Sequence, residues 1–341
     1  MYEAHFGLRQ RPFRGIPDIE CYYPATSHEQ AVSRLLHAIH DDEGLMLLTG
    51  EPGTGKTVVG HVLIDRLGEQ VCCAFLTNSH FADRAGMLQA LNYDLRLPHQ
   101  EKREQDLRLA LTDFLLKNYE SAKRTVLVID EAQHLTPDLL EELRLLGNLE
   151  GKRGKAIQVV LLALPGILET LELRVLAAFD QRLAVRIRLE PLGLHESADY
   201  LVHQLRVVGA TPDEIVSDEA LQILARGGRG IPRLLNRAAH QAFSLAHSAG
   251  ESMVDAEATM EALTRAGLSE GEEPETEDEE VLSTTSEALE PEETMDREDG
   301  RPTLQSVVPD EKPDNQGNPD QPRDPGRARR LFASPRRPAM G

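Results

Sequence analysis

A glycine-rich loop at residues 50–57 constrains the fold of this chain more than any other feature. Its residues match the pattern G-x-x-x-x-G-K-[ST] at every fixed position: Gly50, Glu51, Pro52, Gly53, Thr54, Gly55, Lys56 and Thr57. The apolar run 45–48 precedes the loop, and apolar residues at helical spacing follow it from Val58 onward. A strand, this loop and a helix in that order bind phosphate, so the sequence predicts an α/β fold that holds a nucleoside triphosphate.

The residue types of this loop suit a triphosphate with its metal ion. The glycines let backbone N–H groups and a helix N-terminus face the phosphates, and Lys56 adds a positive charge. The Thr57 hydroxyl is a ligand for Mg²⁺. We therefore expect residues 50–58, Val58 included, to bind the nucleotide; the alternative, a chance glycine-rich turn, is disfavoured by the flanking strand and helix.

A second motif follows the apolar run Val126–Ile129, which ends in Asp130 and Glu131. Open α/β sheets bind their ligands at the carboxyl ends of the strands. Asp130 would hold Mg²⁺, directly or through water, and Glu131 would orient and polarise the water that attacks the γ-phosphate. The alternative is a strand that runs into a solvated loop, but the presence of the phosphate loop favours the catalytic interpretation.

The composition limits the partners and the location of the protein. Its formal charge is -20, yet residues 270–299 alone contain 15 acidic residues and one Arg, so the rest of the chain is only mildly acidic. This gives no general electrostatic case for nucleic acid. Cys21, Cys72 and Cys73 are too few and wrongly spaced for a zinc site, and their odd number argues against a disulfide framework. With no signal sequence and no apolar run of membrane-spanning length, we expect a cytoplasmic protein without a membrane span.

The organisation of the chain follows from its apolar patterns. Strands are expected near residues 45–49, 71–77, 125–130, 157–163 and 185–189, with helical segments between them, which implies a parallel five-stranded sheet with helices on both faces. We expect residues 1–43 to be the N-terminal segment of the module, 44–190 the nucleotide-binding α/β domain, and 191–267 a small all-α domain. Residues 268–341, acidic and then Arg-rich, should form a disordered tail, either a tether or electrostatic arm or a merely solvated extension.

With these motifs, the chain resembles the AAA+ ATPases and, among them, the general secretion pathway protein A (ExeA-type) family, over about residues 1–267. The matching residues are Met1-Tyr2, Phe6-Gly7-Leu8, Arg11-Pro12-Phe13, Pro17-Asp18, Tyr23, His28, Asp130-Glu131-Ala132-Gln133, the stretch 143–150, Gln181-Arg182-Leu183, Pro191-Leu192 and the stretch 230–236. The resemblance covers the ATPase module of that family only.

The resemblance implies an ASCE-type P-loop sheet, a helical lid, and ATP with Mg²⁺ in the cleft between them. It implies that Arg233 is the sensor-2 residue, projecting from a lid helix toward the γ-phosphate; the alternative is a solvent-exposed Arg at a helix start. It also implies that Arg182 is an arginine finger that acts on a neighbouring subunit of a homo-oligomer. Arg186, or an ordinary surface role for Arg182, remains an alternative.

One position departs from the family pattern. Where the family has Gly-Gln-Pro after the fourth strand, this chain has Ala163, Leu164 and Pro165. Leu164 cannot donate the hydrogen bond that helps to position the attacking water, so ATP binding is expected but the hydrolysis rate is in doubt. Asn78 is either a switch residue that contacts Glu131 or a turn-forming residue.

The sequence therefore predicts an ATPase motor or switch whose nucleotide-driven change is read by an unidentified partner protein, with a secretion-related or envelope-related role implied by the resemblance alone. One alternative is a DNA-associated AAA+ helper of the transposition type, since DNA binding is possible but not indicated. The other is a scaffold that binds ATP and scarcely hydrolyses it.

Overall fold

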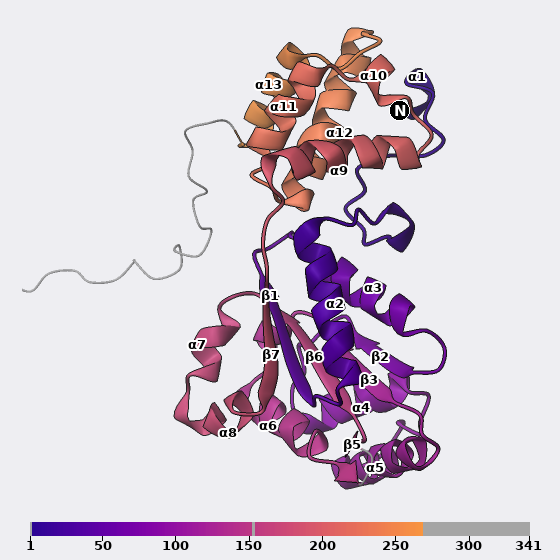
Figure 1. Cartoon of the computed structure of the whole chain (residues 1–341), viewed down its shortest axis with the longest axis vertical. Coiled ribbons are helices and arrows are strands. Elements are labelled where there is room, and N and C mark those ends of the chain that lie inside the picture. The colour runs from indigo at the N-terminus through magenta and orange to yellow at the C-terminus, as the bar shows by residue number, and fades with distance from the viewer. Residues whose placement is uncertain (1, 152–153, 269–341) are drawn as a thin grey trace, which may run out of the picture. The chain divides into compact units, whose positions relative to one another are not determined.

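The computed structural model describes residues 2–151 and 154–268, and their centre is a parallel β-sheet of five strands (Figure 1). The strands lie in the order β2-β3-β6-β1-β7. Their bounds are Leu45–Gly50 for β1, Cys72–Leu76 for β2, Thr125–Ile129 for β3, Gln158–Ala163 for β6 and Leu183–Leu189 for β7. The predicted five-stranded parallel sheet is confirmed, with ends that differ from the expected ones by up to two residues.

Helices cover both faces of this sheet, as predicted. Alternate side chains of β1 point to opposite faces, because successive residues of a strand do so. Met46 and Leu48 share one buried cluster with α2 (Thr26–His40) and α3 (Lys56–Leu67), which Figure 1 shows across that face. Leu45 and Leu47 belong to a second cluster with helices of the other face. Those helices are α4 (Arg84–Asp94), α5 (Glu104–Glu120), α6 (Pro137–Leu146), α7 (Ile167–Leu171) and α8 (Ala177–Asp180).

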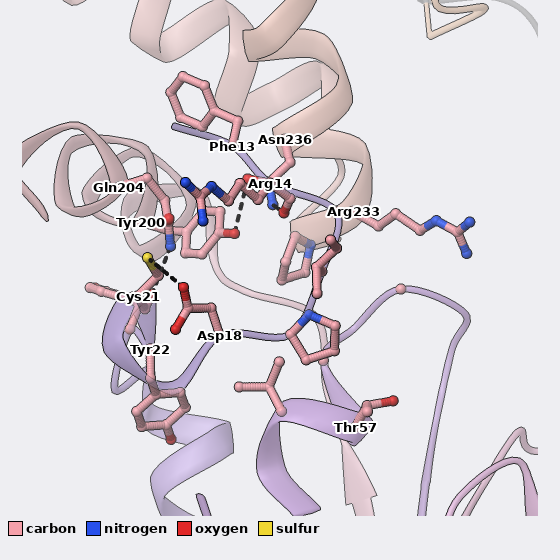
Figure 2. A pocket seen from close by; sticks show the side chains of 18 of the residues that line it. Phe13, Arg14, Asp18, Cys21, Tyr22, Thr57, Tyr200, Gln204, Arg233 and Asn236 are labelled. Atoms are coloured by element: carbon pink, nitrogen blue, oxygen red, sulfur yellow. Dashed lines mark hydrogen bonds between the residues drawn. The ribbon is translucent and has the colours of Figure 1, made fainter. Parts of the chain in front are cut away.

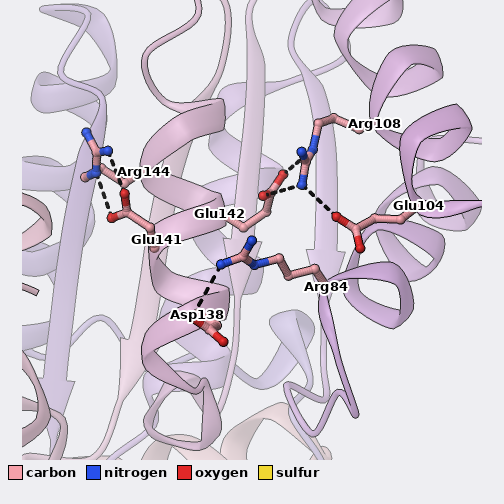
Figure 3. Close-up of polar contacts among 7 residues, drawn as sticks. All are labelled: Arg84, Glu104, Arg108, Asp138, Glu141, Glu142 and Arg144. Atoms are coloured by element: carbon pink, nitrogen blue, oxygen red, sulfur yellow. Dashed lines mark hydrogen bonds and ion pairs between the residues drawn. The ribbon is translucent and has the colours of Figure 1, made fainter. Parts of the chain in front are cut away.

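A polar contact joins two helices of that second face (Figure 3). The Glu142 carboxylate on α6 is 1% exposed and accepts hydrogen bonds of 2.9 and 2.7 Å from Nε and Nη2 of Arg108 on α5. Arg108 also donates to Glu104, one turn earlier on its own helix. A carboxylate buried this deeply is tolerated only when it is paired, so Arg108 is a structural residue of this face.

The register of the sheet brings the chemistry-bearing residues to one edge. Leu76 of β2 pairs with Ile129 of β3, and Thr49 of β1 pairs with Ala163 of β6. Because β6 lies between β3 and β1, the loops after these three strands are neighbours. The phosphate loop, Asp130 and Leu164 therefore start side by side at the carboxyl edge.

The chain after β7 is helical through residue 265. The helices are α9 (Leu194–Val207), α10 (Pro212–Ile215), α11 (Asp218–Gly227), α12 (Pro232–Ala249) and α13 (Ala256–Arg265). Their core also contains Tyr2, Phe6 and Phe13 from the other end of the chain. The Phe6 and Phe243 rings lie 5.1 Å apart, and the Tyr2 hydroxyl is 3.0 Å from Nδ1 of His240. Residues 2–13 are thus part of the helical core, a placement that the sequence did not predict.

The remaining elements are short. They are α1 (Tyr2–His5), the 3₁₀ helices η1 (Ile19–Cys21), η2 (Ala132–His134) and η3 (Arg174–Leu176), and the antiparallel pair β4 (Glu150–Gly151) and β5 (Gly154–Lys155). Within residues 2–151 and 154–268, none of the helices combines the length and the apolar character needed to cross a bilayer. The predicted disordered tail lies outside the described residues, apart from Leu268, and the domain boundaries remain predictions.

Candidate nucleotide-binding site

The phosphate loop joins β1 directly to α3, as the motif predicts. Gly53 and Gly55 have φ values of 80° and 103°, a region that L-residues with a side chain rarely adopt. Thr54 is fully buried, and its hydroxyl donates to the Glu51 carbonyl at 2.9 Å, which closes the turn from inside. Helix α3 begins at Lys56, so its free backbone N–H groups lie at the loop, where anions bind.

His28 of α2 forms a hydrogen bond to the backbone of this loop. Its Nε2 lies 2.8 Å from the Thr54 carbonyl, which can only accept, so Nε2 carries the proton. A Cβ built on Gly55 would lie 3.0 Å from that same nitrogen. Burial lowers the pKa of His28, partly offset by the Thr54 hydrogen bond, so the ring packs as a neutral donor against the loop.

The Lys56 side chain lies inside the loop rather than in solvent. It is 7% exposed, and Nζ donates to the Gly50 and Glu51 carbonyls at 2.9 and 3.0 Å. Burial lowers the pKa of Lys56, while the charges of Glu131, Asp130 and Glu51 act in the opposite direction. The amine is therefore held among acidic groups and carbonyls at the place where the motif needs a cation.

Thr57 and Asp130 come together although they are far apart in the sequence. The Thr57 hydroxyl donates to Oδ2 of Asp130 at 2.6 Å, and Asp130 is 4% exposed. The other carboxylate oxygen, Oδ1, accepts from the Glu131 N–H at 2.9 Å. Hydroxyl and carboxylate oxygens are ligands that Mg²⁺ prefers, and the ion takes only one or two carboxylates beside substrate phosphates. The two residues thus fit the predicted magnesium site.

Glu131 is held in a left-handed backbone conformation, with φ of 53°. The Ser79 hydroxyl donates to its carbonyl, and Nε2 of Gln133 donates to its Oε2 at 2.6 Å. Asn78 has a different partner, because its Oδ1 accepts from the His80 N–H at 2.9 Å. This geometry supports the turn-forming interpretation of Asn78, and the side chain bonded to the Glu131 carboxylate is Gln133.

A cavity of about 520 Å³ adjoins these groups (Figure 2). Its lining contains residues of the phosphate loop, Glu131 and Leu164, together with Arg233 of α12. Most of the rest of the lining comes from the N-terminal strap, defined here as residues 9–23, and from the helices after β7 (α9 to α13 with their loops), called the helical domain here; it includes Arg14, Tyr22, Tyr200, Gln204 and Asn236. The cavity is large enough for a nucleotide, since ligand pockets measure roughly 300–1,000 Å³.

Comparison with known proteins agrees with this geometry. Residues 39–171 match the family model described as AAA domain. Over 255 residues the chain is 36% identical to General secretion pathway protein A of Aeromonas hydrophila, an alignment that covers 74% of this chain and 46% of that protein. The chain contains an AAA+ ATPase module. It spans about half the length of this relative, at 46%.

Solved structures show the same fold. The ORC2 protein of Aeropyrum pernix, in ADPNP–ADP complexes, matches with a TM-score of 0.59 and 16% identity over 75% of this chain and 70% of that one. Cdc6p from Pyrobaculum aerophilum matches with a TM-score of 0.58 and 18% identity over 73% and 71% of the two chains. At such low identity the likeness concerns the fold alone, and the predicted fold class is confirmed.

In the AAA+ module, Arg233 contacts the phosphate loop through its backbone. Pro232 opens α12, where its fixed φ suits the first helical turn. The Arg233 N–H donates to the Gly53 carbonyl at 3.3 Å, and a Cβ built on Gly53 would lie 2.6 Å from Cβ of Arg233. The Arg233 side chain is exposed and, in Figure 2, extends away from Tyr200 and Gln204. The residue is thus beside the loop, as the resemblance implies, and its sensor role remains a prediction.

Arg182 does not line this cavity. Its Nη1 donates to Oδ1 of Asn148 at 2.7 Å. The alternative residue, Arg186, forms an ion pair of 2.5 Å with Asp180. Neither arginine lines the cavity next to the phosphate loop, so a role in catalysis would require a neighbouring subunit.

The strap and the helical domain are tied together by side chains that sequence reasoning did not select (Figure 2). Nδ2 of Asn236 donates to the Arg14 carbonyl at 3.1 Å, and the Tyr200 hydroxyl donates to Oδ1 of Asn236 at 2.9 Å. Nε2 of Gln204 donates to the Cys21 carbonyl at 2.9 Å. Asn236 is the last residue of the family-like stretch 230–236, and this match was the only sequence evidence that pointed to it. No sequence pattern pointed to Tyr200 or Gln204.

Proposed function

We propose that this protein binds ATP with Mg²⁺ and hydrolyses it, and that a partner protein reads the resulting change in the helical domain. The observation that carries the proposal is the contact of 2.6 Å between the Thr57 hydroxyl and Asp130, with Glu131 next in the chain and Lys56 in the same loop. The residues proposed as metal ligands, base and phosphate-binding cation thus lie at one edge of the sheet, which supports phosphoryl transfer to water.

Each group has a role that its surroundings support. Lys56 and the N–H groups of the loop bind the β- and γ-phosphates, and Thr57 with Asp130 hold Mg²⁺, which when bound neutralises charge on the phosphate oxygens. Glu131 accepts a hydrogen bond from the attacking water and orients it. Arg233, at the start of α12, approaches the γ-phosphate, so the position of the helical domain depends on which nucleotide is bound.

The N-terminal strap supplies the remaining wall of the nucleotide site. Because Asn236 and Gln204 bond to carbonyls of the strap, the strap and the helical domain should move as one body. ATP hydrolysis would release the Arg233 contact and shift both together. We propose that the partner protein recognises this change, and that it does so in the cytoplasm. The similarity to General secretion pathway protein A suggests a secretion-related role.

The magnesium site gives the sharpest test of the site assignment. Thr57→Ala removes one ligand oxygen, so phosphate release should require a higher Mg²⁺ concentration, whereas Thr57→Ser keeps the hydroxyl and should behave like the parent protein. Phosphate release is measured against Mg²⁺ concentration at saturating ATP. An unchanged Mg²⁺ requirement in Thr57→Ala would remove Thr57 from the metal site.

We further propose that Arg182 completes the site of a neighbouring copy in a homo-oligomer. Two variants, Glu131→Gln and Arg182→Ala, should each be inactive alone, and a mixture should recover part of the turnover, because some interfaces pair an intact Glu131 with an intact Arg182. Mixed oligomers that form without any recovered turnover would argue for Arg186, or for a site that works within one subunit.

A further inference from the structure

Strand β6 is followed by an apolar residue at the position where the family pattern has a polar side chain. Leu164, which follows β6, lines the same cavity as Glu131 but cannot donate a hydrogen bond from its side chain. The structure places another side chain at this point. Gln133, in the 3₁₀ helix after Glu131, accepts from the Leu164 N–H at Oε1, at 3.0 Å, and donates from Nε2 to Oε2 of Glu131, at 2.6 Å.

The orientation of the Gln133 amide follows from its partners. A backbone N–H can only donate, so the amide oxygen must face Leu164, and the NH₂ group must then face Glu131. The second hydrogen of the NH₂ group has an acceptor as well, because Nε2 of Gln133 lies 3.3 Å from Nε2 of His134. The His134 ring stacks on His80 at a centroid distance of 3.9 Å, which limits its movement. The amide is therefore fixed at both ends.

A hydrogen bond from a neutral donor changes what the Glu131 carboxylate can do. It fixes Oε2 and leaves Oε1 to accept from water, and it adds no proton-accepting group that would compete with the carboxylate. The left-handed backbone of Glu131, with φ of 53°, and the hydroxyl of Ser79 on its carbonyl already fix the peptide. Gln133 fixes the end of the side chain, so the complete residue is preorganised.

We propose that Gln133 is the positioning residue of this ATPase site: it orients the Glu131 carboxylate, and through it the attacking water, which the side chain at position 164 cannot hydrogen-bond. Through the Leu164 N–H it also links the orientation of Glu131 to the end of β6. This inference rests on the proposed ATP hydrolysis. It gives the attacking water a fixed partner in Glu131, although the donor missing at position 164 is not itself replaced.

The experiment compares turnover and ATP affinity in the full-length protein and three variants. Gln133→Met keeps the length of the side chain and removes both polar ends. It should lower kcat about 10-fold to 100-fold, as the loss of a side chain that orients a functional group does, with ATP affinity within about 3-fold of the parent. Gln133→Glu still accepts from the Leu164 N–H but cannot donate to Glu131, so it should also lose turnover. Gln105→Met makes the same chemical change on an exposed face of α5 and should have no effect.

The rescue variant separates positioning from a purely structural clamp. In Gln133→Met combined with Leu164→Asn, the new amide lies on the cavity wall that Glu131 also lines, so a hydrogen bond to Glu131 or to the attacking water should raise turnover several-fold over Gln133→Met. Melting temperatures are measured for every variant, since a clamp that only holds η2 against β6 would lower stability and ATP affinity together.

Three results would overturn the inference: parental turnover in Gln133→Met, a matching loss of ATP affinity, or no recovery in the double variant. The parent protein supplies the separate test of the proposed function. A parent that binds ATP and releases no phosphate would overturn the proposed hydrolysis and, with it, the role of Gln133.

Discussion

Replacing Gly230 with Ala should destabilise the helical domain far more than the same change at Gly250. Both glycines follow a helix and have similar left-handed backbones, with φ of 73° and 79°. An Ala at either position pays about 1–2 kcal/mol for that conformation. A Cβ on Gly250 meets nothing within 4 Å, whereas a Cβ on Gly230 would lie 2.1 Å from the Leu192 carbonyl oxygen. Because that atom belongs to the backbone, it cannot rotate away.

The additional cost at Gly230 can be sized from its contacts. The Leu192 N–H donates to the Gly230 carbonyl at 2.8 Å, and moving the two segments apart would weaken that bond by about 1 kcal/mol. Overpacking adds about 1–3 kcal/mol. We therefore expect Gly230→Ala to lower the free energy of unfolding in urea by roughly 3–6 kcal/mol, against roughly 1–2 kcal/mol for Gly250→Ala. Equal losses of unfolding free energy in the two variants would refute the claim that the contact with Leu192 fixes the loop before Arg233.

Three further predictions test single parts of the account. Lys56→Ala should abolish most ATP binding in calorimetry, because it removes the one cationic side chain that the phosphate loop aims at the phosphates; unchanged affinity would contradict this. Arg108→Met should lower the free energy of unfolding by roughly 2–3 kcal/mol, since it leaves the buried Glu142 unpaired, whereas Arg84→Met, whose partner Asp138 is 83% exposed, should cost less than about 0.5 kcal/mol. Burial lowers the pKa of His28 in the folded state below its unfolded value, so the stability that neutral His28 contributes is complete above about pH 6.5 and is lost as the pH falls through the folded pKa. In a pH series of urea unfolding, the free energy of unfolding should therefore fall less steeply with decreasing pH in His28→Gln than in the parent protein.

The sheet and the core of the site could be predicted because their signals are local. Each central strand contains a continuous run of at least four apolar residues, and β1, β3 and β6 are buried along their whole length. The edge strand β7 alternates between buried and exposed residues, so its first two residues were missed. The phosphate loop and Asp130 are encoded by short patterns at strand ends, and the sheet register then brings them together.

The remaining features depend on contacts between distant residues. Tyr2 and Phe6 carry no periodic pattern that would place them against Phe243, more than 230 positions later, yet they complete the helical core. Gln133 belonged to a matched motif but had no assigned role, because its partner is a backbone N–H 31 positions away after another strand. Side chains that satisfy remote backbone groups leave no trace in local spacing.

The most direct test of the account is ATP hydrolysis by Glu131→Gln. The amide keeps the shape of the carboxylate but cannot accept a proton from water or polarise it as strongly, while the phosphate loop and Asp130 are untouched. We predict ATP affinity within about 3-fold of the parent protein and a loss of phosphate release of about 100-fold or more, with Glu120→Gln, an exposed residue at the end of α5, as the control. Parental phosphate release in Glu131→Gln would contradict the assignment of the catalytic carboxylate.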